Sequence, residues 1–171
     1  MRLVLDTFLN GGGRTIKMCS DRPIPPDEYA VIAKHVPIVS VDLLVHHNGG
    51  LLLGKRQNEP AKNTWFVPGG TVMKGESRRQ AAHRVAQEEL GCEIIIEKNI
   101  GVYDHRYQAA ESEGVDSKQY LATAFVVTPV SDSFKTDDQH TEFNVFTAPF
   151  DGVHKYINRY LTELRYRGYS Y

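Results

Sequence analysis

The sequence predicts an α/β (α+β) fold, a sandwich of helices packed on a mixed β-sheet. Three observations support this prediction: short β-branched and apolar segments bounded by turn residues, a central segment with helical periodicity, and a C-terminal segment of the same kind. At 171 residues, the chain has the length of one domain with a sizeable core. We predict that this domain spans residues 27–171, and that residues 1–26, which contain GGG and PIPP, form an N-terminal arm or hairpin.

The predicted strands follow the apolar runs in chain order. The first spans residues 38–46, and the turn signal Asn48-Gly49-Gly50 leads into a second at 51–55. Further strands are predicted at 93–97, 99–107, 120–128 and 143–146. The polar segment 108–118 is predicted to be a mobile loop.

Three helices are predicted, at residues 27–34, 77–90 and 153–167. The central helix has Ser77 as a suitable N-cap and Gly91 as a suitable residue after its end. Its apolar stripe consists of Ala82, Val85, Ala86 and Leu90. The C-terminal helix has an apolar face made of Ile157, Tyr160, Leu161 and Leu164.

Composition excludes several classes of partner. A net charge of −1 gives no support to nucleic-acid binding. No apolar run approaches the roughly 20 residues of a membrane span, and the first residues lack a convincing signal peptide. Two cysteines are too few for a disulfide framework, which suits a reducing compartment. We therefore expect a cytoplasmic protein with neither a membrane nor a nucleic acid as partner.

The segment 70–92 carries the chemistry. Gly70 is followed after five residues by Glu76, after seven more by Arg84, and then by Glu88, Glu89 and Gly91. Hard cations such as Mg²⁺ or Mn²⁺ take oxygen ligands, often one or two carboxylates. A solvated acidic helix end is the simpler interpretation, but it would require every one of these spacings to coincide.

This string resembles the Nudix box, the signature of hydrolases that cleave nucleoside diphosphates linked to another group. One position departs from it, because Val85 follows Arg84 where the usual box has glutamate. We infer a poorer site with one magnesium ion that needs a ligand from elsewhere in the chain. Over residues 36–160, the segments LLLGKR, WFVPGG, GVYDHRY, SKQYLATAF and DDQH resemble the GDP-mannose mannosyl hydrolase group of this family.

The resemblance implies a role for individual residues. The Gly69 carbonyl, the Glu89 carboxylate and Gln139 would bind the metal ion. His140 would be the general base, and Arg56 would hold the diphosphate leaving group.

Further roles follow from the same resemblance. Arg84 would orient the metal-binding glutamate or contact phosphate, and the sugar nucleotide would be held or polarised by Asp42, His105 and Tyr120. Two positions depart from the bacterial enzyme of this group: Thr71 replaces an arginine beside the substrate, and Glu88 replaces an apolar residue and would add a metal contact. Most other histidines are expected to be solvated, namely His35, His46, His47, His83 and His154.

The function implied is magnesium-dependent hydrolysis of a GDP-sugar, foremost GDP-mannose, to GDP and free sugar. Water would attack sugar carbon C1, and the enzyme would be a homodimer. A first alternative is a conventional Nudix pyrophosphohydrolase that cleaves the phosphoanhydride of ADP-ribose or another nucleotide; Glu88 and Thr71 favour it slightly. A second is a non-catalytic Nudix scaffold that binds a nucleotide or a protein, against which the retained Arg84 and Glu89 argue.

Overall fold

The computed structural model describes residues 24–58, 61–108, 115–135 and 140–169. Most of the predicted arm and most of the predicted 108–118 loop therefore lie outside the described residues. The elements are α1 (Pro26–His35), β1 (Ile38–His47), β2 (Gly50–Arg56), β3 (Trp65–Phe66), β4 (Gly69–Thr71), α2 (Arg78–Val85), the π-helix η1 (Ala86–Leu90), β5 (Ile94–Tyr107), β6 (Lys118–Pro129), β7 (His140–Phe146) and α3 (Ile157–Tyr166). No helix in the described ranges has the length and apolar character needed to cross a membrane.

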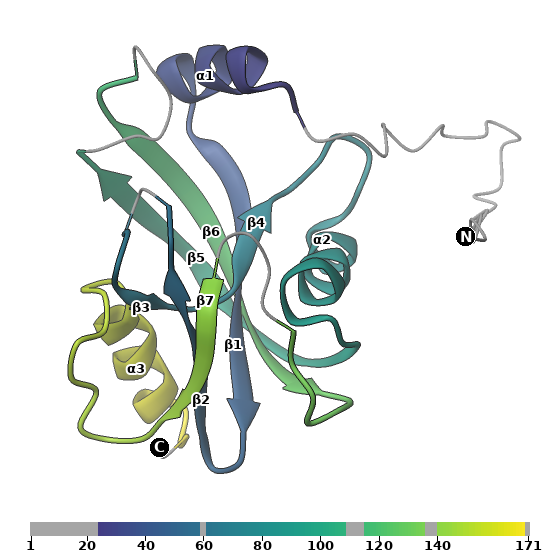
Figure 1. Ribbon diagram of the computed structural model, residues 1–171, viewed down its shortest axis with the longest axis vertical. Helices are drawn as coiled ribbons and strands as arrows, with labels where there is room; N and C mark the ends of the chain where they lie inside the picture. The colour runs from purple at the N-terminus through teal and green to yellow at the C-terminus, as the bar shows by residue number, and fades with distance from the viewer. Residues whose placement is uncertain (1–23, 59–60, 109–114, 136–139, 170–171) are drawn as a thin grey trace, which may run out of the picture.

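The strands form one mixed sheet between two helices, as predicted. Its main order is β3-β2-β1-β6-β5, with β4 paired to β1 and β7 paired to β2. The central pair β1–β6 is parallel and the remaining pairs are antiparallel. Helices α2 and α3 lie on opposite sides of this sheet, and α1 lies near one end of it (Figure 1). The predicted fold class is confirmed.

Two predicted strands prove to be one. Residues 93–97 and 99–107 were expected to be separate, but β5 runs without a break from Ile94 to Tyr107. Its pairing with β6 shifts between Ile96 and Lys98 and again between Asn99 and Gly101. The polar residues at these bulges suggest a break between two strands when only the sequence is considered. They remain within one strand because a bulge adds an unpaired residue without ending the strand.

The box helix begins as predicted and ends differently. The Ser77 hydroxyl accepts a hydrogen bond from the Gln80 backbone N–H, and the Gln80 side chain accepts one from the Ser77 N–H. Regular α-helix stops at Val85 and a π-turn follows, with Gly91 in the left-handed conformation (φ 69°) after it. The expectation of one regular helix over residues 77–90 is therefore wrong for its last five residues, Ala86–Leu90, which are π-helical.

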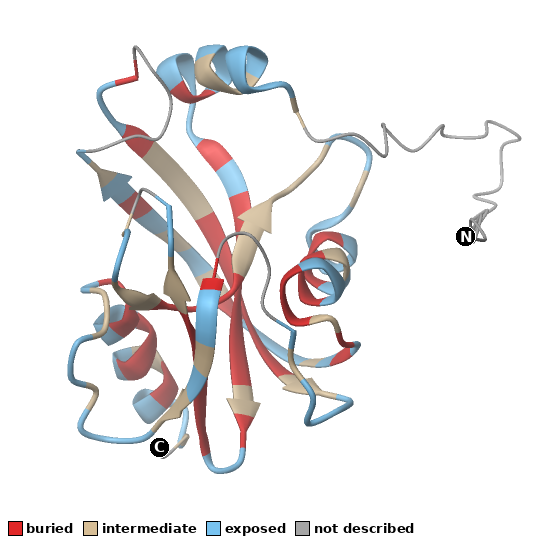
Figure 2. Ribbon diagram, in the orientation of Figure 1, coloured by how far each residue is buried: buried red, intermediate tan, exposed pale blue. Residues whose placement is uncertain are grey.

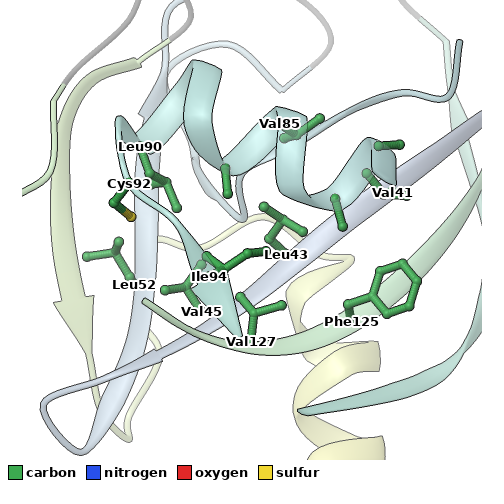
Figure 3. Packing of buried hydrophobic residues seen from close by; sticks show 13 residues of the cluster. Val41, Leu43, Val45, Leu52, Val85, Leu90, Cys92, Ile94, Phe125 and Val127 are labelled. Carbon is green, nitrogen blue, oxygen red and sulfur yellow. The ribbon is translucent and has the colours of Figure 1, made fainter. Parts of the chain in front are cut away.

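The buried apolar residues form two main clusters, one on each face of the sheet (Figure 2). The first joins α2 and η1 to β1 and includes Val41, Val85 and Leu90 (Figure 3). The second joins α3 to the other face through Ile157, Leu161 and Leu164. Val85 is thus a core residue, which gives a packing reason for its apolar side chain.

Gly70 is required by close packing against that core residue. A Cβ on Gly70 would lie 2.8 Å from Val85 Cγ2. We expect Gly70→Ala to destabilise the fold by about 1–3 kcal/mol through overpacking, and Val85→Ala by about 2 kcal/mol through a cavity. In the double variant the added methyl group occupies the space that the shorter side chain at position 85 leaves. The loss of stability in the double variant should therefore be about 1 kcal/mol smaller than the sum of the losses in the two single variants. Urea unfolding of the four proteins measures this, and simple additivity would contradict it.

Candidate active site

A cavity of about 180 Å³ lies where β1, β2, β4, β5 and β6 meet beneath α1. Six of the predicted site residues line it: Asp42, Arg56, Gly69, Thr71, His105 and Tyr120. Strand pairing brings them together, since Asp42 pairs with Gly69 and His105 pairs with Tyr120. Among the described residues, the lining does not include four other candidates: Arg84, Glu88, Glu89 and His140.

Gly69 connects the cavity to the box helix. Its N–H donates a 3.0 Å hydrogen bond to Glu89 Oε2, and the Glu89 side chain is buried. A Cβ on Gly69 would lie 2.7 Å from both Asp42 Oδ1 and the Val41 carbonyl oxygen. Gly69 and Gly70 both belong to β4 and neither has a positive φ, so neither is a glycine that a left-handed turn requires. The glycine permits a close approach of backbone to a carboxyl group instead.

A buried polar cluster forms the wall behind Asp42. The Tyr160 hydroxyl donates a 2.5 Å hydrogen bond to Asp42 Oδ2 and lies 3.1 Å from His105 Nε2. Burial raises the pKa of Asp42 from 3.8 to about 7, although the Tyr160 hydrogen bond and the Arg56 charge oppose this shift. Burial, together with the charges of Arg159 and His154, lowers the pKa of His105 to about 4. The His105 imidazole is therefore neutral near pH 7.

Arg84 braces the loop that precedes the helix. Its guanidinium donates to both Glu76 carboxylate oxygens, at 3.1 and 2.6 Å, and to the Thr71 carbonyl oxygen at 2.8 Å. It also donates to Glu88 Oε2 at 2.8 Å. The two glutamates raise the pKa of Arg84, with the Glu76 hydrogen bond as the largest cause. Arg84 thus joins the loop to the helix end, and Glu88 is engaged with it and 58% exposed.

His140 lies in β7 directly opposite Arg56 of β2. It is 1% exposed, with its ring 5.1 Å from that of Phe143 and against the backbone of Gly54. Gln139, the predicted third metal ligand, lies outside the described residues. The predicted base and the predicted phosphate-binding arginine are therefore paired residues on neighbouring strands.

The oxygen donors near Gly69 suit a hard cation. Glu89 offers a buried carboxylate beside the Gly69 backbone. In the described part of the chain, no group of three or more His, Cys, Asp or Glu side chains gathers where it could hold a metal ion. Carboxylate and carbonyl oxygens are donors of the type that such a cation takes, with water or phosphate oxygen completing the shell.

Several residues at the site are not among the candidates that the sequence predicts. Tyr29 and Tyr107 line the cavity, with the Tyr29 hydroxyl 3.2 Å from that of Tyr120. His154 was expected to be solvated, but its ring packs against Phe66, and burial lowers its pKa to about 4. His47 is likewise buried. An aromatic or histidine in a polar segment gives no signal of such packing until the tertiary neighbours are known.

The raised pKa of Asp42 predicts a pH-dependent cost in stability. Because the pKa of Asp42 is higher in the folded state than in the unfolded state, the stability that its protonated form contributes is fully present below about pH 4. That stability is lost as the pH rises through the folded-state pKa of about 7. Asp42→Asn removes this dependence. We expect the stability of Asp42→Asn relative to wild type to rise by about 2 to 3 kcal/mol between about pH 5 and about pH 8. Urea unfolding in EDTA at both pH values measures it, and a constant difference would contradict the burial of an ionisable Asp42.

Comparison with known proteins identifies the class. The NUDIX domain family model matches residues 36–159, so the chain belongs to the Nudix family of hydrolases. Enzymes of this family generally use divalent metal ions such as Mg²⁺ and act on nucleotide derivatives. The predicted family membership is confirmed.

The similar proteins include one of high identity. The chain is 51% identical over 148 residues to the low-salt glycan biosynthesis protein Agl8 of Haloferax volcanii, covering 85% of this chain and 95% of that protein. It is 29% identical to the ADP-ribose pyrophosphatase of Methanocaldococcus jannaschii, covering 64% of this chain and 62% of that protein. Among solved structures, the MutT protein from Methanosarcina mazei Go1 has a TM-score of 0.64 at 22% identity, covering 78% of this chain and 98% of that one. This last likeness concerns the fold alone.

Proposed function

We propose that this protein is a magnesium-dependent hydrolase of a GDP-sugar, foremost GDP-mannose, and releases GDP and free sugar by attack of water at sugar C1. One observation carries the proposal: a single cavity combines a cationic Arg56 and the β4 backbone with the polar groups of Asp42, His105 and Tyr120. The first part suits a diphosphate and the second suits a sugar nucleotide. The 51% identity to a protein named for glycan biosynthesis supports a sugar-containing substrate.

Arg56 would hold the leaving diphosphate. A guanidinium pairs with two phosphate oxygens at once, and the pairing strengthens as negative charge gathers on the leaving group. Thr71 would contact the same part of the substrate from β4. Asp42, His105 and Tyr120 would hold the sugar nucleotide by hydrogen bonds from the other side of the cavity.

Glu89, the Gly69 carbonyl and Gln139 would hold the magnesium ion. Bound there, Mg²⁺ would supply positive charge that stabilises the departing diphosphate. Val85 is buried in the core and Glu88 is engaged by Arg84, which leaves Glu89 as the carboxylate beside Gly69. This arrangement supports one ion rather than a cluster of ions. Attack at carbon then requires a base apart from the metal ligands, and His140 would take that role.

Phosphoanhydride hydrolysis is the second candidate function. It is favoured by the 29% identity to an ADP-ribose pyrophosphatase and by the presence of three glutamates of the box, Glu76, Glu88 and Glu89. A non-catalytic scaffold is disfavoured, because Glu89 is buried against Gly69 and the cavity holds Arg56 and Asp42 beside it.

Product analysis on a panel of nucleotide sugars tests the proposal. With Mg²⁺, GDP-mannose should yield GDP and mannose. A nucleoside monophosphate and a sugar phosphate would support the second candidate instead. Tight nucleotide binding without any hydrolysis would support the scaffold.

Replacing Arg56 should weaken the reaction selectively. We expect Arg56→Met to lower kcat/KM for GDP-mannose by about 10²-fold, because one charge-assisted phosphate contact is lost. Lys55→Met is the matched control, since Lys55 is partly exposed and pairs with Glu142 on the surface. Steady-state kinetics on both variants make the test, and equal losses would remove Arg56 from the site.

The protein is also proposed to be a homodimer in the cytoplasm, with residues 1–26 as an arm outside the catalytic domain 27–171. Analytical ultracentrifugation of the full chain and of a variant lacking residues 1–23 tests the dimer and the independence of the domain. A monomeric full chain would exclude the dimer.

A further inference from the structure

Helix α3 reaches the back of the cavity through one buried side chain, that of Tyr160. The residue is 0% exposed and does not line the cavity. Its hydroxyl donates to Asp42 Oδ2 at 2.5 Å and lies 3.1 Å from His105 Nε2. Both partners do line the cavity, and Asp42 is 118 residues away in sequence. Tyr160 therefore contacts two residues of the cavity wall without lining the cavity itself.

The proton count at this hydroxyl fixes the state of His105. A tyrosine hydroxyl has one hydrogen, and when Asp42 is ionised its carboxylate can only accept, so that hydrogen is donated to Asp42 Oδ2. The 3.1 Å contact to His105 then requires His105 Nε2 to carry the proton and donate it. His105 Nδ1 lies 3.7 Å from Asp42 Oδ2, too far for a hydrogen bond. The neutral ring is thus held as the Nε2–H tautomer.

The same hydroxyl orients the Asp42 carboxyl group. Because Oδ2 is held by Tyr160, Oδ1 lies on the β4 side, 2.7 Å from the position that a Cβ on Gly69 would occupy. Loss of the hydroxyl would free this group to rotate. Loss would also leave a buried carboxyl oxygen without its donor.

Other contacts of His105 do not replace this effect. The ring stacks on Tyr156 at 4.2 Å and 7°, which fixes the plane of the ring but not the nitrogen that carries the proton. The Tyr160 ring packs edge-on against Tyr103 at 4.8 Å, and phenylalanine would fill that space equally well. The buried hydroxyl is therefore what distinguishes Tyr160 from a core aromatic residue.

We propose that Tyr160 is a positioning residue for hydrolysis, whose hydroxyl orients the Asp42 carboxyl group and holds His105 as the Nε2–H tautomer. The role rests on the proposed function, since Asp42 and His105 act on the sugar nucleotide there. Because Tyr160 does not line the cavity, it would act through these two groups.

Tyr160→Phe tests the proposal, with Tyr103→Phe as the matched control. Tyr103 also loses only a hydroxyl, which donates to the Ile100 carbonyl oxygen at 3.4 Å, and it lies outside the cavity lining. We expect Tyr160→Phe to lower kcat about 10- to 100-fold with KM changed less than about twofold, and Tyr103→Phe to leave kcat within about twofold of wild type. Equal kcat values for wild type and a folded Tyr160→Phe would overturn the proposal.

A spectroscopic measurement makes the proposal testable without turnover. At about pH 9, where Asp42 is ionised, the ¹⁵N chemical shifts of the His105 ring should report the Nε2–H tautomer in the wild-type protein and loss of that preference in Tyr160→Phe. An Nδ1–H tautomer in the wild type would overturn the proposal even if Tyr160→Phe does not fold. If wild type hydrolyses no nucleotide sugar, the proposed function fails, whereas the tautomer result separately decides whether Tyr160 controls His105.

Discussion

Glu89→Gln is expected to lower kcat by about 10³-fold or more, since loss of the carboxylate proposed to hold the cation would remove several kcal/mol of transition-state stabilisation. The fold should survive, because the glutamine carbonyl oxygen can still accept the Gly69 N–H that Glu89 accepts now. Magnesium affinity should fall together with kcat. Isothermal titration with Mg²⁺ and steady-state kinetics measure the two effects on the same preparation.

The neighbouring residue offers a matched control. Glu88→Gln makes the same chemical change one position earlier, on a side chain that is 58% exposed and paired with Arg84. We expect it to change kcat by less than about tenfold, because an exposed ion pair contributes little. If Glu88→Gln costs as much as Glu89→Gln, both glutamates bind metal. In that case the one-carboxylate site that underlies the proposed chemistry is wrong.

His140→Ala is expected to lower kcat by about 10²- to 10⁴-fold, the usual contribution of a general base. GDP and Mg²⁺ should still bind, because the proposed ligands for both lie on other residues. His83→Ala is the control, as His83 is exposed on α2 and takes no part in the cavity. Since His140 is buried, thermal unfolding must first establish that the variant is folded.

The folded His140→Ala protein decides the role of this residue. Turnover within about threefold of wild type would exclude a general base worth two or more orders of magnitude. Loss of GDP binding together with turnover would instead indicate that His140 shapes the β2–β7 edge around Arg56.

The sequence predicted elements whose signals are local. The Ser77 cap, Gly91 and the turn at Gly49 depend on a few neighbouring residues, and each occurs where expected. The end of regular α-helix at Val85 was not predictable, because the π-turn that follows places Leu90 and Glu89 against the sheet and is a tertiary effect.

The candidate site was predictable only in part. The spacing of Gly70, Glu88 and Glu89 indicates a metal site, but the meeting of Asp42, His105 and Tyr120 depends on strand register and was expected from family resemblance alone. Tyr160 was read as part of an apolar helix face. Helical periodicity counts the ring of a tyrosine and ignores its hydroxyl, so the link to Asp42 required the tertiary structure.

Hydrolysis of GDP-mannose in ¹⁸O water tests the central claim most directly, with the position of the label read by mass spectrometry of both products. Attack at sugar carbon predicts ¹⁸O in mannose and none in GDP. Label in a phosphate product would show attack at phosphorus and would contradict the account.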